Sequence, residues 1–314
     1  MYVGIDLGGT NIAAGVVDEN GKILTQASVP TKAIRPNEEY AEDMVMIAKK
    51  VIADAGLKIS DIKSIGVGAP GSIDSINGKV YDSDNIGMDD FALAEYIKNG
   101  TGLPVFLEND ANAAAFGEYA INGNGAESFV FVTLGTGVGG GIVIDGKIFR
   151  GFNGTGAEIG HTCIEMDGEK CTCGRVGCWE AYASVTALIR QTRKAMEENP
   201  MSLMHELADK EGKVSGRTSF DAAKQGDEAA MKVVENYARY VGVGVANMIN
   251  IFQPNKIVIG GGISKEGDYL LSRIKKYADN YDYNRSQEKV KIEMATLFND
   301  AGIIGAAFAA KARV

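Results

Sequence analysis

Two glycine turns, each set between short apolar runs, restrict the fold of this chain more than any other feature. Residues 5–18 read IDLGGTNIAAGVVD and residues 132–145 read VTLGTGVGGGIVID, at a constant offset of 127 residues. Each segment predicts a strand, a glycine turn and a second strand, followed by an Asn-Gly or Asp-Gly hairpin turn. The repeat predicts two domains built on one plan. Chance similarity is the alternative, because glycine is common here, at 40 of 314 residues.

Strands and helices alternate along the rest of the chain, which predicts an α/β architecture. Asn37 is expected to cap the first helix. The expected helices cover residues 37–55, 89–99, 180–198, 227–252, 269–277 and 301–311, and the expected strands cover residues 62–67, 105–107, 256–259 and 290–297.

Composition excludes several classes of function. The chain has 41 acidic and 32 basic side chains, a formal net charge of −9, which argues against nucleic acid as the main partner. No apolar stretch approaches the ~20 residues of a membrane-spanning helix, so no membrane association is expected. The chain opens directly into a strand pattern without an export signal, which predicts a cytoplasmic location.

The glycine turns predict a nucleotide site, because closely spaced backbone N–H groups suit phosphate oxygens. We expect Asp6 to hold Mg²⁺, directly or through water, and Thr10 and Asn11 to donate to phosphate. The turn at residues 135–137 would hold the rest of the phosphate chain. Two purely structural hairpins are the alternative. Residues 135–140 also match the dinucleotide pattern G-x-G-x-x-G, but a strand is expected after them where that motif requires a helix.

The cysteines predict a metal site. All four lie within residues 163–178, and the chain has no export signal, so metal binding is favoured over disulfides. With four protein ligands the metal would have no open position for water, so its role is expected to be structural. Cys163 is the spare thiol, and four unligated thiols are the alternative. The expected zinc ligands are His161, Cys171, Cys173 and Cys178.

A carboxylate is expected where a strand ends and a helix begins, in the sequence Glu108-Asn109-Asp110. Ligands of α/β sheets bind at such strand ends. Asp110 can accept a proton from a hydroxyl there, with Asn109 orienting the acceptor. The alternative is that Asp110 only caps the helix.

Together these motifs resemble the ROK family of sugar kinases over essentially the whole chain. The motifs that carry the resemblance are DLGGTN at 6–11, ENDA at 108–111, LGTGVGGG at 134–141, EIGH at 158–161 and CTCGRVGCWE at 171–180. The resemblance implies a duplicated actin/hexokinase-like (ribonuclease H-like) α/β fold with an active-site cleft between two domains. The smaller domain would comprise residues 1–117 and 299–314, and the larger domain, with the zinc loop, residues 118–298.

The resemblance also implies an activity, the ATP-dependent phosphorylation of glucose at the 6-hydroxyl, with Asp110 as general base. Magnesium would accompany ATP, and His161 would use one ring nitrogen for zinc and the other for sugar. The implied sugar ligands are Gly71, Asn85, Asn109, Asp110, Glu158, His161 and Glu180. The implied nucleotide ligands are Asp6, Gly8, Gly9, Thr10, Asn11, Thr136, Gly137, Gly261 and Gly262.

Two alternatives stay open at this point. One is a kinase of the same family for another hexose, namely N-acetylmannosamine, N-acetylglucosamine, mannose or fructose. The other is a sugar-sensing regulator without catalysis. One departure from the family pattern is the segment Gly154-Thr155-Gly156-Ala157 before Glu158, where Ala-Gly is more usual. A homodimer or higher homo-oligomer is expected.

Overall fold

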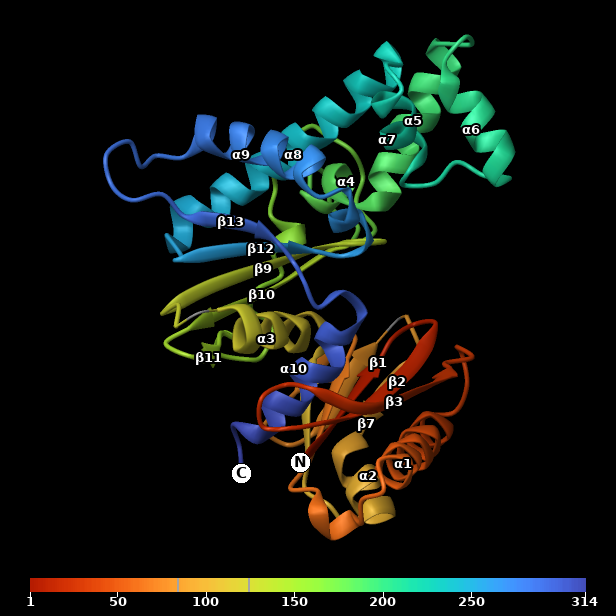
Figure 1. Ribbon diagram of the computed structural model, residues 1–314, viewed down its shortest axis with the longest axis vertical. Coiled ribbons are helices and arrows are strands. Elements are labelled where there is room, and N and C mark those ends of the chain that lie inside the picture. The colour runs from red at the N-terminus through yellow and green to blue at the C-terminus, as the bar shows by residue number, and fades with distance from the viewer. Residues whose placement is uncertain (84, 124) are drawn as a thin grey trace. The chain divides into compact units, whose positions relative to one another are not determined.

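A computed structural model describes residues 1–83, 85–123 and 125–314 of the protein (Figure 1). Internal contacts divide the chain into two compact units. Unit 1 comprises Met1–Phe131, Gly141–Ala157 and Leu297–Val314, and unit 2 comprises Val132–Gly140 and Glu158–Thr296. None of the helices in the described part of the chain is both long enough and apolar enough to cross a bilayer.

Unit 1 contains a five-stranded sheet in the order β3-β2-β1-β4-β8. β1 pairs antiparallel with β2 and parallel with β4, and β4 pairs parallel with β8. A smaller sheet has the order β5-β6-β7. The strands are β1 (Tyr2–Leu7), β2 (Asn11–Val17), β3 (Ile23–Pro30), β4 (Ile65–Ala69), β5 (Ser72–Asp74), β6 (Lys79–Ser83), β7 (Met88–Phe91) and β8 (Val105–Asn109).

One helix of unit 1 is made from the far end of the chain. The helices of this unit are α1 (Asn37–Asp54), α2 (Leu93–Thr101), α3 (Asp110–Asn122) and α10 (Ala301–Lys311). α10 packs on α3, β1 and β4. It approaches the sheet so closely that a Cβ at Gly4 would lie 1.8 Å from Ile303 O, and a Cβ at Gly66 equally close to Ala306 O. Any larger residue at position 4 or 66 would collide with the backbone of α10, so glycine is required at both positions.

Unit 2 is mainly helical around the strands β12 (Lys256–Gly260) and β13 (Lys291–Met294), which pair in parallel. α9 lies beside α8 and contacts β13 (Figure 1). The helices are α4 (Glu180–Ala183), α5 (Val185–Glu198), α6 (Leu203–Glu211), α7 (Thr218–Lys224), α8 (Glu228–Phe252) and α9 (Asp268–Tyr281).

The second large sheet repeats the order of the first. Its order is β11-β10-β9-β12-β13, with β9 (Ser128–Leu134), β10 (Val138–Ile144) and β11 (Lys147–Ile148) in the places of β1, β2 and β3. β9 and β10 contribute residues to both units. The duplicated plan is therefore confirmed. The second glycine turn runs into the strand β10, so the dinucleotide motif is correctly rejected.

Several expected elements differ from those observed. Residues 88–91 form β7, which pairs with β6, so the helix expected from residue 89 begins only at Leu93. The helix expected over 180–198 breaks at Ser184, whose extended backbone and hydroxyl cap α5 by accepting a bond from Ala187 N at 3.1 Å. Asn37 is the first residue of α1 and not its cap; its amide donates to Asp89 O at 3.1 Å.

The predicted domain boundary after residue 117 falls inside α3. Contacts keep the whole of α3 in unit 1, together with residues 118–131 and 141–157. The physical reason is that α3 packs along α10, which itself covers the first sheet. Leu297 N adds a hydrogen bond to the buried Glu118 Oε1 of α3, at 2.8 Å.

Candidate active site and metal centre

The first glycine turn joins β1 to β2 and is supported by the residue that follows β3. Gly8 N donates to Asn11 O at 3.0 Å, and the Thr31 hydroxyl donates to Gly8 O at 2.6 Å. Thr31 N donates to Thr10 O at 2.9 Å. These bonds use the carbonyl groups of the turn. Gly9, Thr10 and Asn11 are exposed, so the turn can receive an anion from solvent.

Two half-buried carboxylates interact in unit 1, at the ends of β1 and β8. Burial and, second, the negative charge of Asp110 raise the pKa of Asp6 to about 6. Burial also raises the pKa of Asp110. A carboxylate with a raised pKa accepts a proton more readily near neutral pH. The pair therefore offers one strong base and a second oxygen ligand suited to a divalent cation.

The cap of α3 is Asn109 and not Asp110. Asn109 Oδ1 accepts bonds from Ala111 N at 3.0 Å and from Asn112 N at 3.2 Å. Asn109 Nδ2 donates to Gly71 O at 3.3 Å, which ties the strand end to the turn between β4 and β5. Asp110 is the first helical residue, and its Oδ1 accepts a bond from Ala111 N at 2.8 Å, the same amide that Asn109 Oδ1 accepts.

The second glycine turn, between β9 and β10, is supported from outside its own hairpin. Val138 N donates to Glu180 Oε2 at 3.0 Å. Val185 N donates to Gly135 O at 2.8 Å, and the Thr186 hydroxyl donates to Thr136 O at 2.7 Å. A Cβ at Gly137 would lie 2.3 Å from Glu180 Oε2, so a side chain there would displace this carboxylate.

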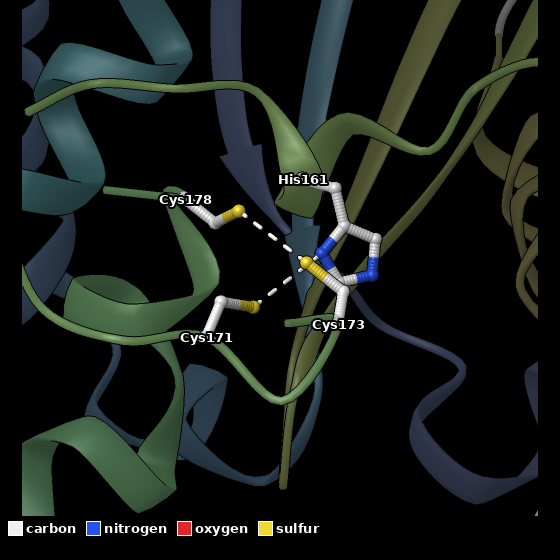
Figure 2. Close-up of side chains that lie close together, drawn as sticks. All are labelled: His161, Cys171, Cys173 and Cys178. Atoms are coloured by element: carbon white, nitrogen blue, oxygen red, sulfur yellow. Dashed lines mark hydrogen bonds between the residues drawn. The ribbon is translucent and has the colours of Figure 1, made fainter. Parts of the chain in front are cut away.

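Unit 2 brings together one histidine and three of the four cysteines. The ligand atoms of His161, Cys171, Cys173 and Cys178 all lie within 4.8 Å of one another. Cys171 Sγ lies 3.6 Å from His161 Nδ1, and Cys173 Sγ lies 3.7 Å from Cys178 Sγ (Figure 2). A tetrahedral zinc ion places two sulfurs about 3.8 Å apart and a sulfur and a nitrogen about 3.5 Å apart. The cluster therefore fits zinc, and Cys163 lies outside it.

The thiols of this cluster differ in acidity. Burial raises the pKa of Cys171, and it raises the pKa of Cys178 to about 12. Hydrogen bonds from the backbone and side chain of Arg175 lower the pKa of Cys173 to about 6. Zinc binds thiolates, so binding here would release protons mainly from the two buried cysteines.

Glu180 connects the cysteine loop to the second glycine turn. Its Oε2 accepts from Val138 N, while Oε1 accepts from the Thr172 hydroxyl at 3.1 Å. Thr172 lies between two of the clustered cysteines. One carboxylate thus bonds the turn with one oxygen and the cysteine loop with the other.

The remaining residues expected in unit 2 lie close to these two features. His161 N donates to Glu158 O at 3.1 Å, and the Glu158 side chain is exposed. Gly261 packs against the backbone of Leu134, the residue before the second turn.

A family comparison decides what kind of protein carries this arrangement. The model of the ROK family matches residues 2–313. The chain belongs to the ROK family. A relative named glucokinase, from Halalkalibacterium halodurans, is 40% identical over 99% of this chain and 94% of its own length. A xylose repressor from Caldicellulosiruptor bescii is 29% identical over 96% of this chain and 76% of its own length.

Solved ROK structures share the fold. A ROK family glucokinase from Streptomyces griseus, in complex with glucose and AMPPNP, is 36% identical and covers 99% of each chain with a TM-score of 0.85. A ROK hexokinase from Thermus thermophilus, 36% identical, covers 99% of this chain and 98% of its own with a TM-score of 0.81. The actin/hexokinase-like fold predicted from the sequence is confirmed.

The residues of the predicted site are divided between the two units of this ROK protein. Unit 1 holds Asp6, Gly8, Gly9, Thr10, Asn11, Gly71, Asn85, Asn109 and Asp110, and unit 2 holds Thr136, Gly137, Glu158, His161, Glu180, Gly261 and Gly262. Sequence reasoning missed Thr31 and Thr186, which support the two turns, and Arg150, whose Nε donates to Glu108 Oε2 at 2.8 Å. None of them stands in a recognisable motif, because their partners lie 23 to 50 residues away.

Proposed function

We propose that this protein transfers the γ-phosphoryl group of ATP to the 6-hydroxyl of glucose. The observation that carries the proposal is the state of Asp110. Its carboxylate stands at the end of a sheet strand and has a raised pKa, while Asn109 is the cap of α3. The names of the relatives, glucokinase and ROK hexokinase, support the same activity.

In this mechanism Asp110 accepts the proton of the sugar 6-hydroxyl. The hydroxyl oxygen forms the new bond to the γ-phosphorus. The bond between that phosphorus and the oxygen of the leaving ADP breaks. Asp6 would hold the magnesium that accompanies ATP, and the exposed residues 9–11 of the first turn donate to phosphate oxygens. The turn at Thr136 and Gly137 binds the rest of the phosphate chain, and Gly261 and Gly262 bind the adenosine side.

The sugar is selected by polar side chains of both units. Asn109, Glu158 and Glu180 bond its other hydroxyls, while Gly71 and Asn85 line its pocket. His161 directs Nδ1 to the cysteine cluster, which leaves Nε2 for a sugar hydroxyl. His161, Cys171, Cys173 and Cys178 would hold zinc, whose role would be structural: a bound ion would fix the plane and tautomer of the imidazole.

The activity is tested by ADP release from Mg-ATP, using zinc-loaded protein with glucose, mannose, fructose, N-acetylglucosamine or N-acetylmannosamine. Asp110→Asn protein purified in the same way controls for contaminating kinases. We expect glucose to be preferred. Preference for an N-acetyl sugar would retain the chemistry and overturn the substrate. Glucose binding without turnover of any sugar would refute the kinase and favour a non-catalytic sugar-sensing regulator; one relative is named xylose repressor.

A cytoplasmic location and a homodimer remain predictions made from the sequence.

A further inference from the structure

A nearly buried ion pair involves Glu108, two residues before the proposed base. The Glu108 side chain, at the end of β8, is only 4% exposed, and its Oε2 accepts two bonds from one guanidinium. Arg150 Nε donates at 2.8 Å and Arg150 Nη2 at 2.5 Å. A carboxylate this deeply buried requires such a partner, because an unpaired buried charge is strongly destabilising.

The other oxygen of Glu108 holds the segment that carries the base. Glu108 Oε1 accepts from Asn109 N at 3.1 Å and from Asn112 Nδ2 at 3.3 Å. Asn112 Oδ1 is buried and has no partner among the described residues, so the bond to Glu108 decides how this amide is turned. Glu108 thus fixes residues on both sides of Asp110.

Arg150 is itself held by a closed loop. Arg150 O accepts from Gly156 N at 2.9 Å, which closes residues 150–156 into a compact turn of unit 1. A second arginine, Arg313, also interacts electrostatically with the pair. It donates to Ser75 O, however, so its guanidinium is engaged elsewhere. The charge that neutralises Glu108 at hydrogen-bond distance comes from Arg150.

We propose that Arg150 is a positioning residue of the phosphoryl transfer, acting through Glu108 on Asn109 and Asp110. The inference rests on the proposed function, since it assigns Asp110 as the base. Without the guanidinium, the Glu108 carboxylate moves toward water and draws the strand end with it. A displacement of about 1 Å at a catalytic group lowers a rate by about 10²-fold.

The test compares three variants of the full-length, zinc-loaded protein. In Arg150→Met we expect kcat to fall by about 10–10²-fold, with the KM for ATP changed less than about twofold. Arg150→Lys retains the charge without the fork geometry and is expected to recover part of kcat. The double variant Glu108→Gln, Arg150→Met removes the unpaired charge, and we expect its kcat to exceed that of Arg150→Met by about tenfold.

Lys289→Met is the matched control. Lys289 Nζ lies 2.5 Å from Asp282 Oδ2, and the Asp282 side chain is 2% exposed, so the variant also leaves a buried carboxylate without its cation. We expect a fall in Tm similar to that of Arg150→Met, and an unchanged kcat. If Arg150→Met does not fold, Arg150→Lys and the double variant decide the question.

Equal kcat in wild type and Arg150→Lys, together with an inactive double variant, would overturn the inference. So would an unchanged kcat in folded Arg150→Met. An equal loss of kcat in Lys289→Met would reduce the effect to general stability and overturn it as well. Wild-type protein inactive on every sugar would instead refute the proposed function, which separates the two failures.

Discussion

The two glycine turns share one hairpin plan but differ in what supports them. The first is supported by Thr31, the residue after β3 of the same sheet, through bonds to Gly8 O and Thr10 O. The second is supported by Glu180, Val185 and Thr186, which follow more than 40 residues later around α4 and α5. The first turn is therefore a local structure, whereas the second depends on the cysteine loop.

The turns also differ in chemistry. At the offset of 127 residues, Asp6 of the first hairpin corresponds to Thr133 of the second, so only the first carries a carboxylate. Asp110 belongs to the same unit as Asp6. Duplication thus retained the hairpin in both units and left both acids in unit 1. Four experiments test this division.

The largest effect is expected from Asp110→Asn, which removes the base and retains the shape of the side chain. General base catalysis contributes ~10²–10⁴-fold, so kcat should fall by that amount. The measurement is ADP release with glucose, alongside zinc content and Tm. The cysteine cluster and the second turn should be unaffected. Retained turnover would remove Asp110 from the mechanism and with it the assignment of the acid chemistry to unit 1.

Asp6→Asn tests the same unit through stability. The pKa of Asp6 rises from 3.8 to about 6 on folding, so the folded state holds this proton more tightly than the unfolded chain. The contribution of this proton to the free energy of unfolding is complete below about pH 4. It is lost as the pH rises through 6, a change of about 3 kcal/mol. Urea unfolding of magnesium-free protein between pH 4 and pH 7 measures it.

In Asp6→Asn protein this part of the pH dependence should disappear. Asp54→Asn, which changes an exposed carboxylate on α1, is the control and should behave as wild type. The same pH slope in wild type and Asp6→Asn would contradict burial as the cause of the raised pKa.

Cys173→Ser tests the dependence of the second turn on the metal loop. Cys173 is exposed, so little packing is lost, and we expect zinc affinity to fall by about 10²-fold. Hydrogen exchange should then accelerate at residues 135–138 and stay unchanged at residues 8–11. Cys163→Ser, outside the cluster, should retain zinc. Equal exchange at both turns would show that their supports do not differ in this way.

The smallest effect is expected from a pair of alanine substitutions, Gly137→Ala and Gly9→Ala. At Gly137 the new Cβ would meet Glu180 Oε2 at 2.3 Å, whereas at Gly9 nothing lies within 4 Å. Gly137→Ala should displace the carboxylate from Val138 N, a loss of about 1–3 kcal/mol for a charged hydrogen bond. Gly9→Ala should leave Tm nearly unchanged. Thermal unfolding checks both, and equal losses would contradict the comparison.

The sequence predicted the features that depend on neighbouring residues. The two hairpins, the strand β8 before Asp110 and the helix α10 follow from local glycine turns and apolar patterns. The division of the chain did not follow, because α3 stays with unit 1 through packing on a helix almost 200 residues away. The small sheet β5-β6-β7 was missed for a similar reason, since its strands are too short to show a period.

In the site, too, local features were predictable from the sequence and long-range contacts were not. The cysteine cluster was predictable because only a few residue types bind zinc, and three cysteines lie within the eight positions 171–178. The cap of α3 was not, since Asn109 and Asp110 are equally suitable and only the structure selects Asn109. Arg150 was not predictable either, because its partner Glu108 lies 42 residues earlier and an isolated arginine in a loop is common.

The position of α10 in the chain has a consequence for synthesis. A ribosome produces the strands of the first sheet early, yet the helix that covers Gly4 and Gly66 emerges only after residues 132–296 have been made. The apolar face of that sheet therefore stays without this covering helix while the second unit is translated. A nascent chain of this protein therefore exposes strands of its first sheet until residues 301–311 have been made.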